Sequence, residues 1–418
     1  MEAPVHVIRR LARTYLRWLF LILLPVAGVL GLPLLHHVQM PSAFGQAVTA
    51  GECAELRPDW QTGGAVPVSA FLNDLPPLRA VTFNLHSGLG PEWRLWVDRA
   101  TAEQNLRHIA RRIASAAPAN APVDVVSLNE VDFDSRRSGW LDQAAFLAGE
   151  LEKLTGYAYQ VRRGETWSRD IPGLEVRFGN ALLSRHPVLE TQDCLLGSEC
   201  PGVPSASPRR AGWLMDTLEE PRGVLKARIA IAGRELDLLV THLEAFRPER
   251  RESQAAEILA RFVDGDVPTL LMGDINAVPS RMTAKRRHFA ADRTHDVLSS
   301  GPLVDARFWV AARDTVELKT WATYPARAPQ WPLDAVFATP DLLPSNVTVL
   351  GSEASDHHGL AVHYDWATAP TKIGYSAWRD NLRRDRWARI LACDRAGEEP
   401  ERLRRLERLT FMSGGRAS

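Results

Sequence analysis

Three short polar clusters, widely separated along the chain, carry side chains suited to metal binding and proton transfer. They are Asn129-Glu130-Val131-Asp132, Gly273-Asp274-Ile275-Asn276 and Ser355-Asp356-His357-His358-Gly359. Each follows or adjoins a short apolar run rich in β-branched residues, and strand ends are where an α/β sheet displays its functional groups. Carboxylates from all three clusters, with a histidine beside one, indicate a divalent metal and a general base acting on one substrate. This combination favours hydrolysis of a phosphate ester.

The segments that would position these clusters show mixed strand and helix patterns. Apolar periodicity predicts helices over residues 102–116, 141–154 and 249–262. Short apolar or alternating runs predict strands over residues 78–83, 123–128, 157–161, 180–184, 224–231, 235–240, 269–272, 335–338, 347–350 and 360–363. Residues 186–221 hold five prolines and two cysteines, which predicts a loop insertion. Strands mixed with helices and a hairpin favour an α/β fold with two sheets over a parallel barrel.

Composition allows a substantial globular core, because 45% of the 418 residues are hydrophobic and 24% are charged. Residues 1–35 carry four arginines and one acidic residue, and residues 371–418 carry twelve basic and seven acidic residues. Because the formal net charge of the whole chain is zero, the residues between these ends carry a net charge of −8. A net-acidic core is a poor match for a long polyanion, so nucleic acid is an allowed but not a favoured partner.

The N-terminal segment is apolar from residue 18 to residue 35 and follows four arginines. Its length suits a membrane span and exceeds most signal-peptide apolar regions, which favours an uncleaved anchor. The arginines should stay in the cytoplasm, so the catalytic region should lie on the periplasmic or extracellular side. The alternative is a cleaved signal peptide and a secreted form. At the other end, the Arg-rich residues 371–418 predict a helical, amphipathic extension.

Four cysteines occur in a compartment that we expect to be oxidising, so disulfides are predicted. Cys194 and Cys200 bracket a short loop, and Cys53 and Cys393 flank the catalytic region. Four cysteines allow three pairings and the sequence does not choose among them; free buried thiols are the alternative.

An ordered set of motifs resembles the endonuclease/exonuclease/phosphatase superfamily from about residue 78 to residue 365. These motifs are Val81-Thr82-Phe83-Asn84, Val125-Val126-Ser127-Leu128-Asn129-Glu130-Val131, Gly179-Asn180-Ala181-Leu182-Leu183-Ser184, Thr241-His242-Leu243, Gly273-Asp274-Ile275-Asn276, Leu333-Asp334-Ala335-Val336-Phe337 and Ser355-Asp356-His357. The resemblance implies a four-layer α/β sandwich, with two mixed β-sheets face to face and helices outside. It also implies cleavage of phosphodiesters or phosphomonoesters with Mg²⁺, for which Mn²⁺ is an alternative.

Metal candidates are the polar residues at three strand ends. Glu130 ends an apolar run, where a buried carboxylate without a partner would be costly and a cation would offset that cost. Asn84 offers an amide oxygen to orient a metal ligand or a water, and Asp356 supplies a second carboxylate.

Catalytic candidates are two histidines with carboxylate and amide neighbours. His357 is the strongest base candidate, and the resemblance implies that Asp334 orients it. Asp274 and Asn276 lie two residues apart, so in an extended segment both face one cleft. The resemblance further implies that His242 binds the phosphate.

Asn180 and Arg222 match family positions with a substrate-binding role. We expect a basic stub and anchor in residues 1–35, a linker or irregular cover in 36–77, a catalytic domain in 78–370 and an extension in 371–418.

The expected function is an Mg²⁺-dependent phosphodiesterase for a lipid or another small phosphodiester. The stretch from Thr241 to Ala245 is similar to sphingomyelinase-type members. Three alternatives stay open: a phosphomonoesterase, a surface or secreted nuclease using basic clusters at residues 209–210 and 285–287, and an inactive membrane-tethered scaffold. Protein partners are not predicted.

Overall fold

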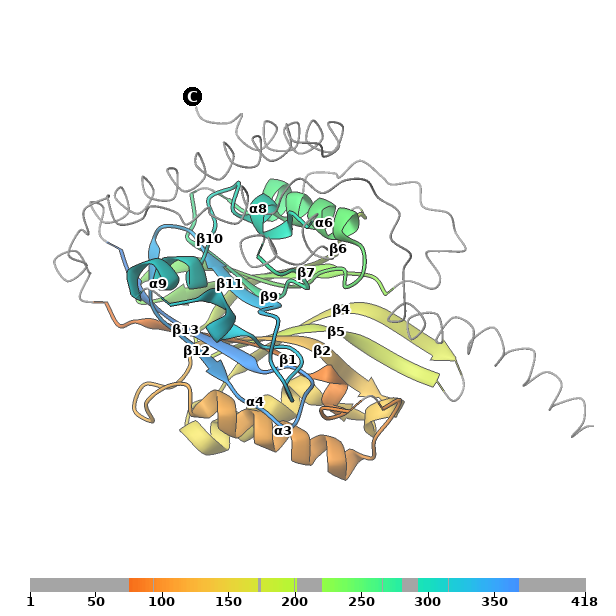
Figure 1. Cartoon of the computed structure of the whole chain (residues 1–418). Coiled ribbons are helices and arrows are strands. Elements are labelled where there is room, and N and C mark those ends of the chain that lie inside the picture. The colour runs from red at the N-terminus through yellow and green to blue at the C-terminus, as the bar shows by residue number, and fades with distance from the viewer. Residues whose placement is uncertain are drawn as a thin grey trace, which may run out of the picture. The chain divides into compact units, whose positions relative to one another are not determined.

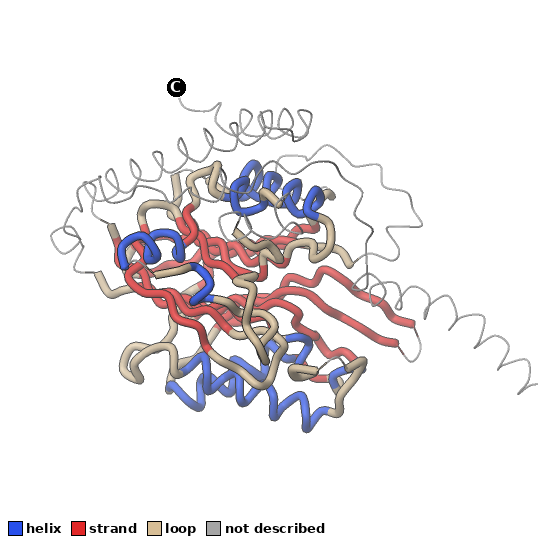
Figure 2. Tube along the Cα trace, viewed as in Figure 1, coloured by secondary structure: helices blue, strands red, loops and turns tan. Residues whose placement is uncertain are grey.

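A computed structural model describes residues 75–92, 94–171, 174–198, 200, 220–264, 266–279, 292–314 and 316–367. These residues form two mixed β-sheets with helices on their outer faces (Figures 1 and 2), so the predicted α/β sandwich is confirmed. The predicted anchor, residues 36–74, the C-terminal extension, Cys53, Cys393 and both basic clusters lie outside the described residues. Within the described ranges, no helix combines the length and the apolar character that a membrane span requires.

The first sheet has seven strands in the order β12-β13-β1-β2-β5-β4, with β3 paired to β2. β1 and β2 are parallel, and the other neighbours are antiparallel. The strands are β1 (Leu78–Asn84), β2 (Val125–Ser135), β3 (Leu141–Asp142), β4 (Gln160–Ile171), β5 (Leu174–Ser184), β12 (Leu342–Leu350) and β13 (Gly359–Trp366).

The second sheet has six strands in the order β10-β11-β9-β8-β7-β6, with only β8 and β9 parallel. They are β6 (Val188–Leu195), β7 (Gly223–Ile231), β8 (Arg234–His242), β9 (Thr269–Asp274), β10 (Val304–Asp305) and β11 (Asp334–Ala338). β6 lies inside the segment predicted as a loop insertion, so that prediction is wrong there. β6 is an edge strand with mostly exposed side chains, and it therefore leaves little apolar pattern in the sequence.

Helices cover the outer face of each sheet. α3 (Arg99–Ala114) and α4 (Gln143–Thr155) pack on the first sheet, and α6 (Pro248–Phe262) and α8 (Thr294–Leu298) pack on the second (Figure 1). α9 (Ala306–Asp314) contributes to the core between the sheets. The remaining short elements are the 3-10 helices η3 (His86–Gly88), η4 (Arg136–Ser138) and η5 (Leu318–Trp321). Asp98 and Asp142 begin α3 and α4 by accepting hydrogen bonds from backbone N–H groups of the first turn.

Side chains alternate across each strand, and this alternation separates the core into layers. Leu78 and Ala80 of β1 belong to the core between the sheets, whereas Val81 and Phe83 pack with α3 and α4. The same period of two continues into the polar residues at the strand ends. It therefore decides which of those residues face the space between the sheets.

Cys194 and Cys200 form a disulfide, with their Cα atoms 5.6 Å apart. This is one of the pairings that the sequence left open. Both cysteines are buried in the apolar cluster under α6, so the bond closes a short loop at the end of β6 against that cluster.

Candidate active site

The polar ends of the central strands face the space between the two sheets. Leu238 and Val240 of β8 belong to the core between the sheets, so the same alternation turns His242 toward it. On β9, Met272 faces that core and Asp274 follows it two residues later. An apolar strand interior therefore ends in a buried functional group, because the inward face continues past the last apolar residue.

Strand pairing then sets these groups side by side. His242 pairs with Asp274 between β8 and β9, and Asp274 pairs with Asp334 between β9 and β11. In the other sheet, Asn84 pairs with Asn129 between the parallel strands β1 and β2. Residues far apart in the sequence thus reach one edge of the sandwich.

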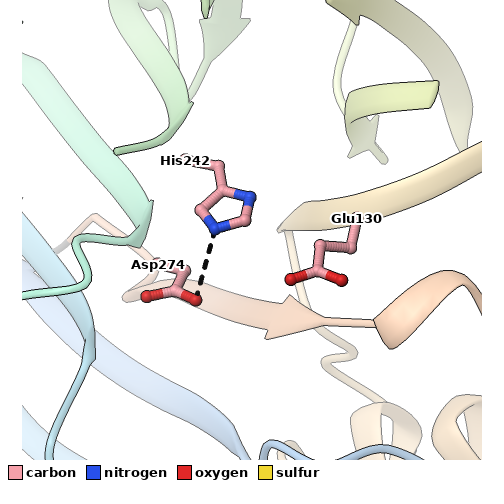
Figure 3. Close-up of side chains that lie close together, drawn as sticks. All are labelled: Glu130, His242 and Asp274. Carbon is pink, nitrogen blue, oxygen red and sulfur yellow. Dashed lines mark ion pairs between the residues drawn. The ribbon is translucent and has the colours of Figure 1, made fainter. Parts of the chain in front are cut away.

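Glu130 is directed into this space by an irregularity in β2. The pairing of β2 with β5 shifts register between Leu128 and Val131, which is the signature of a β-bulge. Glu130 has a left-handed backbone with φ 53°, a strained conformation that recurs at functional sites. The Asn84 amide joins the two carboxylates, since its Nδ2 donates to Glu130 Oε1 at 2.9 Å and to Asp274 Oδ2 at 3.0 Å. Figure 3 shows Glu130 and Asp274 facing His242.

His357 lies between two carboxylates. Its Nδ1 is 2.8 Å from Asp334 Oδ2, where the resemblance placed an orienting acid, and its Nε2 is 3.6 Å from Asp274 Oδ2. Burial alone would lower the pKa of His357, but the charges of Asp334 and Asp274 outweigh burial and raise it to about 10. The ring of Tyr324 lies over this group, with centroids 4.8 Å apart. In this arrangement His357 is an imidazolium at neutral pH.

Asp274 has the complementary property. Burial raises the pKa of this carboxyl to about 6, although the positive charge of His357 acts in the opposite direction. A carboxylate that titrates near neutral pH is a suitable proton acceptor. The two groups therefore divide proton transfer between them, with Asp274 able to take a proton and His357 able to give one.

His242 is held as a neutral imidazole. Burial, then the charges of Arg222 and His357, lower the pKa of His242 well below its ordinary value. Arg222 Nη1 lies 2.8 Å from His242 Nδ1, and Asn276 Nδ2 lies 2.9 Å from His242 Nε2. The guanidinium of Arg222 can only donate, so His242 Nδ1 accepts from it and the single ring proton lies on Nε2, which further disfavours the imidazolium. Within the described residues, the buried Nε of Arg222 has no hydrogen-bond partner.

Asn129 lies in the first motif, and the sequence pattern alone did not predict a role for it. Its Nδ2 donates to Asn180 Oδ1 at 2.8 Å and to the Thr241 carbonyl at 3.0 Å, and its Oδ1 accepts from the Asp274 N–H at 2.9 Å. It therefore connects the two sheets beneath the site. The sequence feature that could have indicated its role is an amide directly before the metal candidate Glu130, at the end of an apolar run. Gly273 permits the close pairing of β8 and β9 beside Asn129, because a Cβ there would meet the Thr241 carbonyl oxygen at 1.8 Å.

Two predicted residues, and one further carboxylate of the first motif, lie at the margin of the cluster. Asn180 is buried beneath it, and its Oδ1 is engaged by Asn129. Asp356 lies beside His86, with Oδ1 3.6 Å from His86 Nδ1, and burial raises its pKa. Asp132, a further carboxylate of the first motif, pairs with Arg137 and does not join Glu130.

A second group that the sequence did not predict, Asp305 with Arg307, contacts the backbone of Asp334. Arg307 is fully buried, pairs with Asp305 through two nitrogens, and donates from Nη1 to the Asp334 carbonyl at 2.9 Å. Asp305 and Arg307 gave no signal, because their sequence carries no feature that distinguishes them from solvated charges.

The donor atoms of the cluster fit a hard divalent cation. Two groups have ligand atoms within 4.8 Å of one another: Glu130, His242 and Asp274, and also Asp274, Asp334 and His357. Glu130 and Asp274 offer carboxylate oxygens, which hard cations prefer. The imidazolium character of His357 and its contact with Asp334 disfavour the second group, which leaves Glu130 as the main cation ligand. Asn84 presents its amide nitrogen to the carboxylates and accepts the His86 N–H at Oδ1, so it orients the ligands.

The comparisons with known proteins agree with this geometry. A family model described as the Endonuclease/Exonuclease/phosphatase family matches residues 81–357, a range that contains every predicted site residue. A comparison with curated proteins found no match.

Solved structures similar to this chain include an endonuclease/exonuclease/phosphatase from Beutenbergia cavernae DSM 12333, with 23% identity and a TM-score of 0.51. The match covers 70% of this chain and 72% of that chain. A family protein from Leptotrichia buccalis C-1013-b has 18% identity and a TM-score of 0.48, over 69% of this chain and 100% of that chain. D. rerio TDP2 complexed with single strand DNA product has 17% identity and a TM-score of 0.44, over 69% and 98%. The first of these structures supports the fold.

The family match over 81–357 and the convergence of its motifs in one cluster lead to one conclusion. This chain belongs to the endonuclease/exonuclease/phosphatase family of metal-dependent phosphoester hydrolases.

Proposed function

We propose that the protein is an Mg²⁺-dependent phosphodiesterase that acts on a lipid or another small phosphodiester. The observation that carries the proposal is the convergence of Glu130, Asp274 and His357 in one buried cluster, linked by Asn84 and by the contact of His357 with Asp274. This set combines oxygen ligands for a hard cation, a proton acceptor and a cationic proton donor.

The residues divide the reaction as follows. Mg²⁺ held by Glu130, with Asn84 and Asp356 nearby, would supply Lewis-acid stabilisation of charge on the phosphoryl group. Asp274 accepts the proton of the attacking water, because its pKa of about 6 leaves it ionised at neutral pH. His357, held by Asp334, stabilises the phosphoryl oxygens and protonates the leaving group. His242, Asn276 and Arg222 form the opposite wall and donate to the phosphoryl oxygens.

Exposed apolar side chains support a lipid substrate. Eight large hydrophobic residues are exposed among the described residues, and five of them lie at the catalytic edge, on the segments that leave β1, β2 and β8 or at the end of β6. The five are Leu95, Trp96, Trp140, Leu195 and Phe246. The β6 register places Leu195 at this edge, because Cys194 and Thr241 both pair with Val224. Apolar residues around the entrance to a site suit the acyl region of a bilayer interface.

The membrane location is part of the proposal. An uncleaved anchor in residues 18–35 would hold the catalytic domain beside a bilayer, on the periplasmic or extracellular side. A tethered enzyme meets lipid substrate at high local concentration, which agrees with the position of the exposed apolar residues.

A substrate panel tests the proposal. The purified full-length chain is incubated with and without EDTA on vesicles of sphingomyelin or glycerophospholipid, on DNA, on RNA and on a phosphomonoester. We expect EDTA-sensitive release of a phosphorylated headgroup from vesicles. Rapid degradation of DNA or RNA at low enzyme concentration would instead identify a nuclease, and no turnover of any ester would identify an inactive scaffold.

The role of the apolar rim is tested with matched variants. Trp96→Ala/Phe246→Ala removes two exposed rings at the catalytic edge, whereas Leu154→Ala/Leu189→Ala removes two exposed side chains at the opposite edge. Burying a large apolar side chain contributes about 1.5–3 kcal/mol, so the first pair should lower turnover on vesicles by at least about tenfold. Turnover of a soluble phosphodiester should be unchanged in both. Equal losses on vesicles for the two pairs would contradict a lipid-binding rim.

A further inference from the structure

A buried polar network lies directly beyond Glu130 and takes no part in the chemistry described above. We propose that Asp132, Arg137, Ser87 and Gln143, called here the Arg137 clamp, hold Glu130 and Asn84 in the geometry that binds the divalent cation. The inference rests on the proposed function, because it requires that Glu130 is a metal ligand. In this assignment Arg137 is a positioning residue that never contacts substrate.

The centre of the clamp is a multidentate ion pair. Arg137 Nε lies 3.1 and 3.0 Å from the two Asp132 carboxylate oxygens, and Arg137 Nη2 lies 2.7 Å from Oδ1. Ser138 Oγ donates to Asp132 Oδ2 at 2.7 Å. The guanidinium also lies over the ring of Phe178, 5.0 Å from its centroid. A planar guanidinium held at so many points has one orientation, which a lysine ammonium cannot reproduce.

The clamp holds the turn that follows β1. Arg137 Nη2 donates to Ser87 Oγ at 2.8 Å, and Gln143 Nε2 donates to the Ser87 carbonyl at 2.6 Å. Gln143 Oε1 in turn accepts the Asp132 N–H at 3.0 Å, which closes the network. The turn needs such support, since His86 and Ser87 have φ of 47° and 51°, a conformation that L-residues adopt at a cost.

Two short paths connect the clamp to the metal candidates. Along the first, the clamped turn fixes the His86 N–H, which donates to Asn84 Oδ1 at 3.0 Å; the Asn84 amide then meets Glu130 and Asp274. Along the second, Asp132 anchors β2 immediately after the bulge that turns Glu130 inward. Glu130 is thus held between an anchored strand on one side and an oriented amide on the other.

A comparable ion pair elsewhere in the chain provides a control. Arg228 binds Asp237 through Nε at 2.7 Å and Nη2 at 3.0 Å. Its side chains are 23% and 0% exposed, against 24% and 0% for Arg137 and Asp132. Asp237 lies near the start of β8, at the strand end opposite His242. The two pairs therefore match in exposure, and each joins Nε and Nη2 of an arginine to one carboxylate, but only the first contacts the site.

The experiment compares Arg137→Lys, Ser87→Ala and Arg228→Lys in the purified full-length chain. Mn²⁺ binding is measured directly by electron paramagnetic resonance, and thermal unfolding is followed with and without Mn²⁺. Residues that orient metal ligands commonly change metal affinity by about 10–100-fold, so we expect a loss of this size in Arg137→Lys. Ser87→Ala should weaken binding in the same direction by less. Arg228→Lys should stay within about twofold of the unmodified chain, whatever it does to the melting temperature.

The outcomes separate this inference from the proposed function. Unchanged Mn²⁺ affinity in both Arg137→Lys and Ser87→Ala would overturn the clamp while leaving a metal-dependent hydrolase intact. Equal losses of affinity in Arg137→Lys and Arg228→Lys would also overturn it, because they would indicate a general effect on folding. If the unmodified chain binds no Mn²⁺ and its hydrolysis resists EDTA, the proposed function and the clamp fail together.

Discussion

Replacing Asp334 by asparagine should convert His357 from a permanent cation into a group that is mostly neutral at working pH. The change keeps the size of the side chain and keeps the Asp334 carbonyl that Arg307 contacts. It removes the charge that lies 2.8 Å from His357 Nδ1 and that contributes most to holding the pKa at about 10 against burial. Without that charge, burial is opposed only by the charges of Asp274 and Asp356, so we expect the pKa of His357 to fall toward its ordinary value of 6.5.

The size of the effect follows from these values. With a pKa of about 10, only roughly one His357 ring in 300 is neutral at pH 7.5, so the donor is fully protonated. With an ordinary pKa, about a tenth of the rings stay protonated at pH 7.5 and about a hundredth at pH 8.5. Loss of orientation adds a further factor, since a positioned acid or base contributes about 10²–10⁴ in rate. We therefore expect a loss of about 10³ at pH 7.5.

The assay is a pH–rate profile on a chromogenic phosphodiester with saturating Mg²⁺, with circular dichroism as a control for folding. In the unmodified enzyme, activity should persist to high pH and fall as His357 loses its proton near pH 10. In Asp334→Asn, the ratio of unmodified to variant rates should rise about tenfold between pH 7.5 and 8.5. A loss that is the same at both pH values would refute the argument that Asp334 acts by keeping His357 charged.

Two further predictions follow from the same cluster. In Asp274→Asn, turnover should fall by at least about 10² and the acidic limb of the profile, which reports protonation of Asp274 near pH 6, should disappear; a persisting limb would assign it to another group. In Gly273→Ala, the added methyl group meets the Thr241 carbonyl oxygen and φ is 150°, so we expect a loss of at least about 1–3 kcal/mol in unfolding free energy, measured by urea denaturation, together with lost activity. An unchanged urea midpoint would contradict the inference that β8 and β9 need the close contact at Gly273.

Much of the fold was readable because the strands are short and apolar and the helices are amphipathic. Helices predicted over 102–116, 141–154 and 249–262 correspond to α3, α4 and α6, with ends shifted by a few residues. β6 was missed because its side chains are largely exposed and carry little apolar periodicity. α8 and α9 were missed because both are short.

The candidate site was predictable in its residue types but not in its connections. Glu130 and Asp132 are equivalent by sequence pattern, since both follow the same apolar run. The bulge that distinguishes them is visible only once β2 is paired with β5. It places Glu130 against Asn84, whereas Asp132 pairs with Arg137. A bulge depends on the opposing strand, so no local pattern reveals it.

The chain's order of residues determined the alternation that turns Asn84, His242 and Asp274 inward at the ends of apolar strands, because side-chain direction along a strand has a fixed period of two. The sequence did not determine the protonation states of Asp274 and His357. The tertiary structure decided that by burying Asp274, Asp334 and His357 together, where low dielectric and opposite charges shift the pKa of Asp274 to about 6 and that of His357 to about 10. Those shifts depend on distances between side chains from different strands, and such distances exist only after folding.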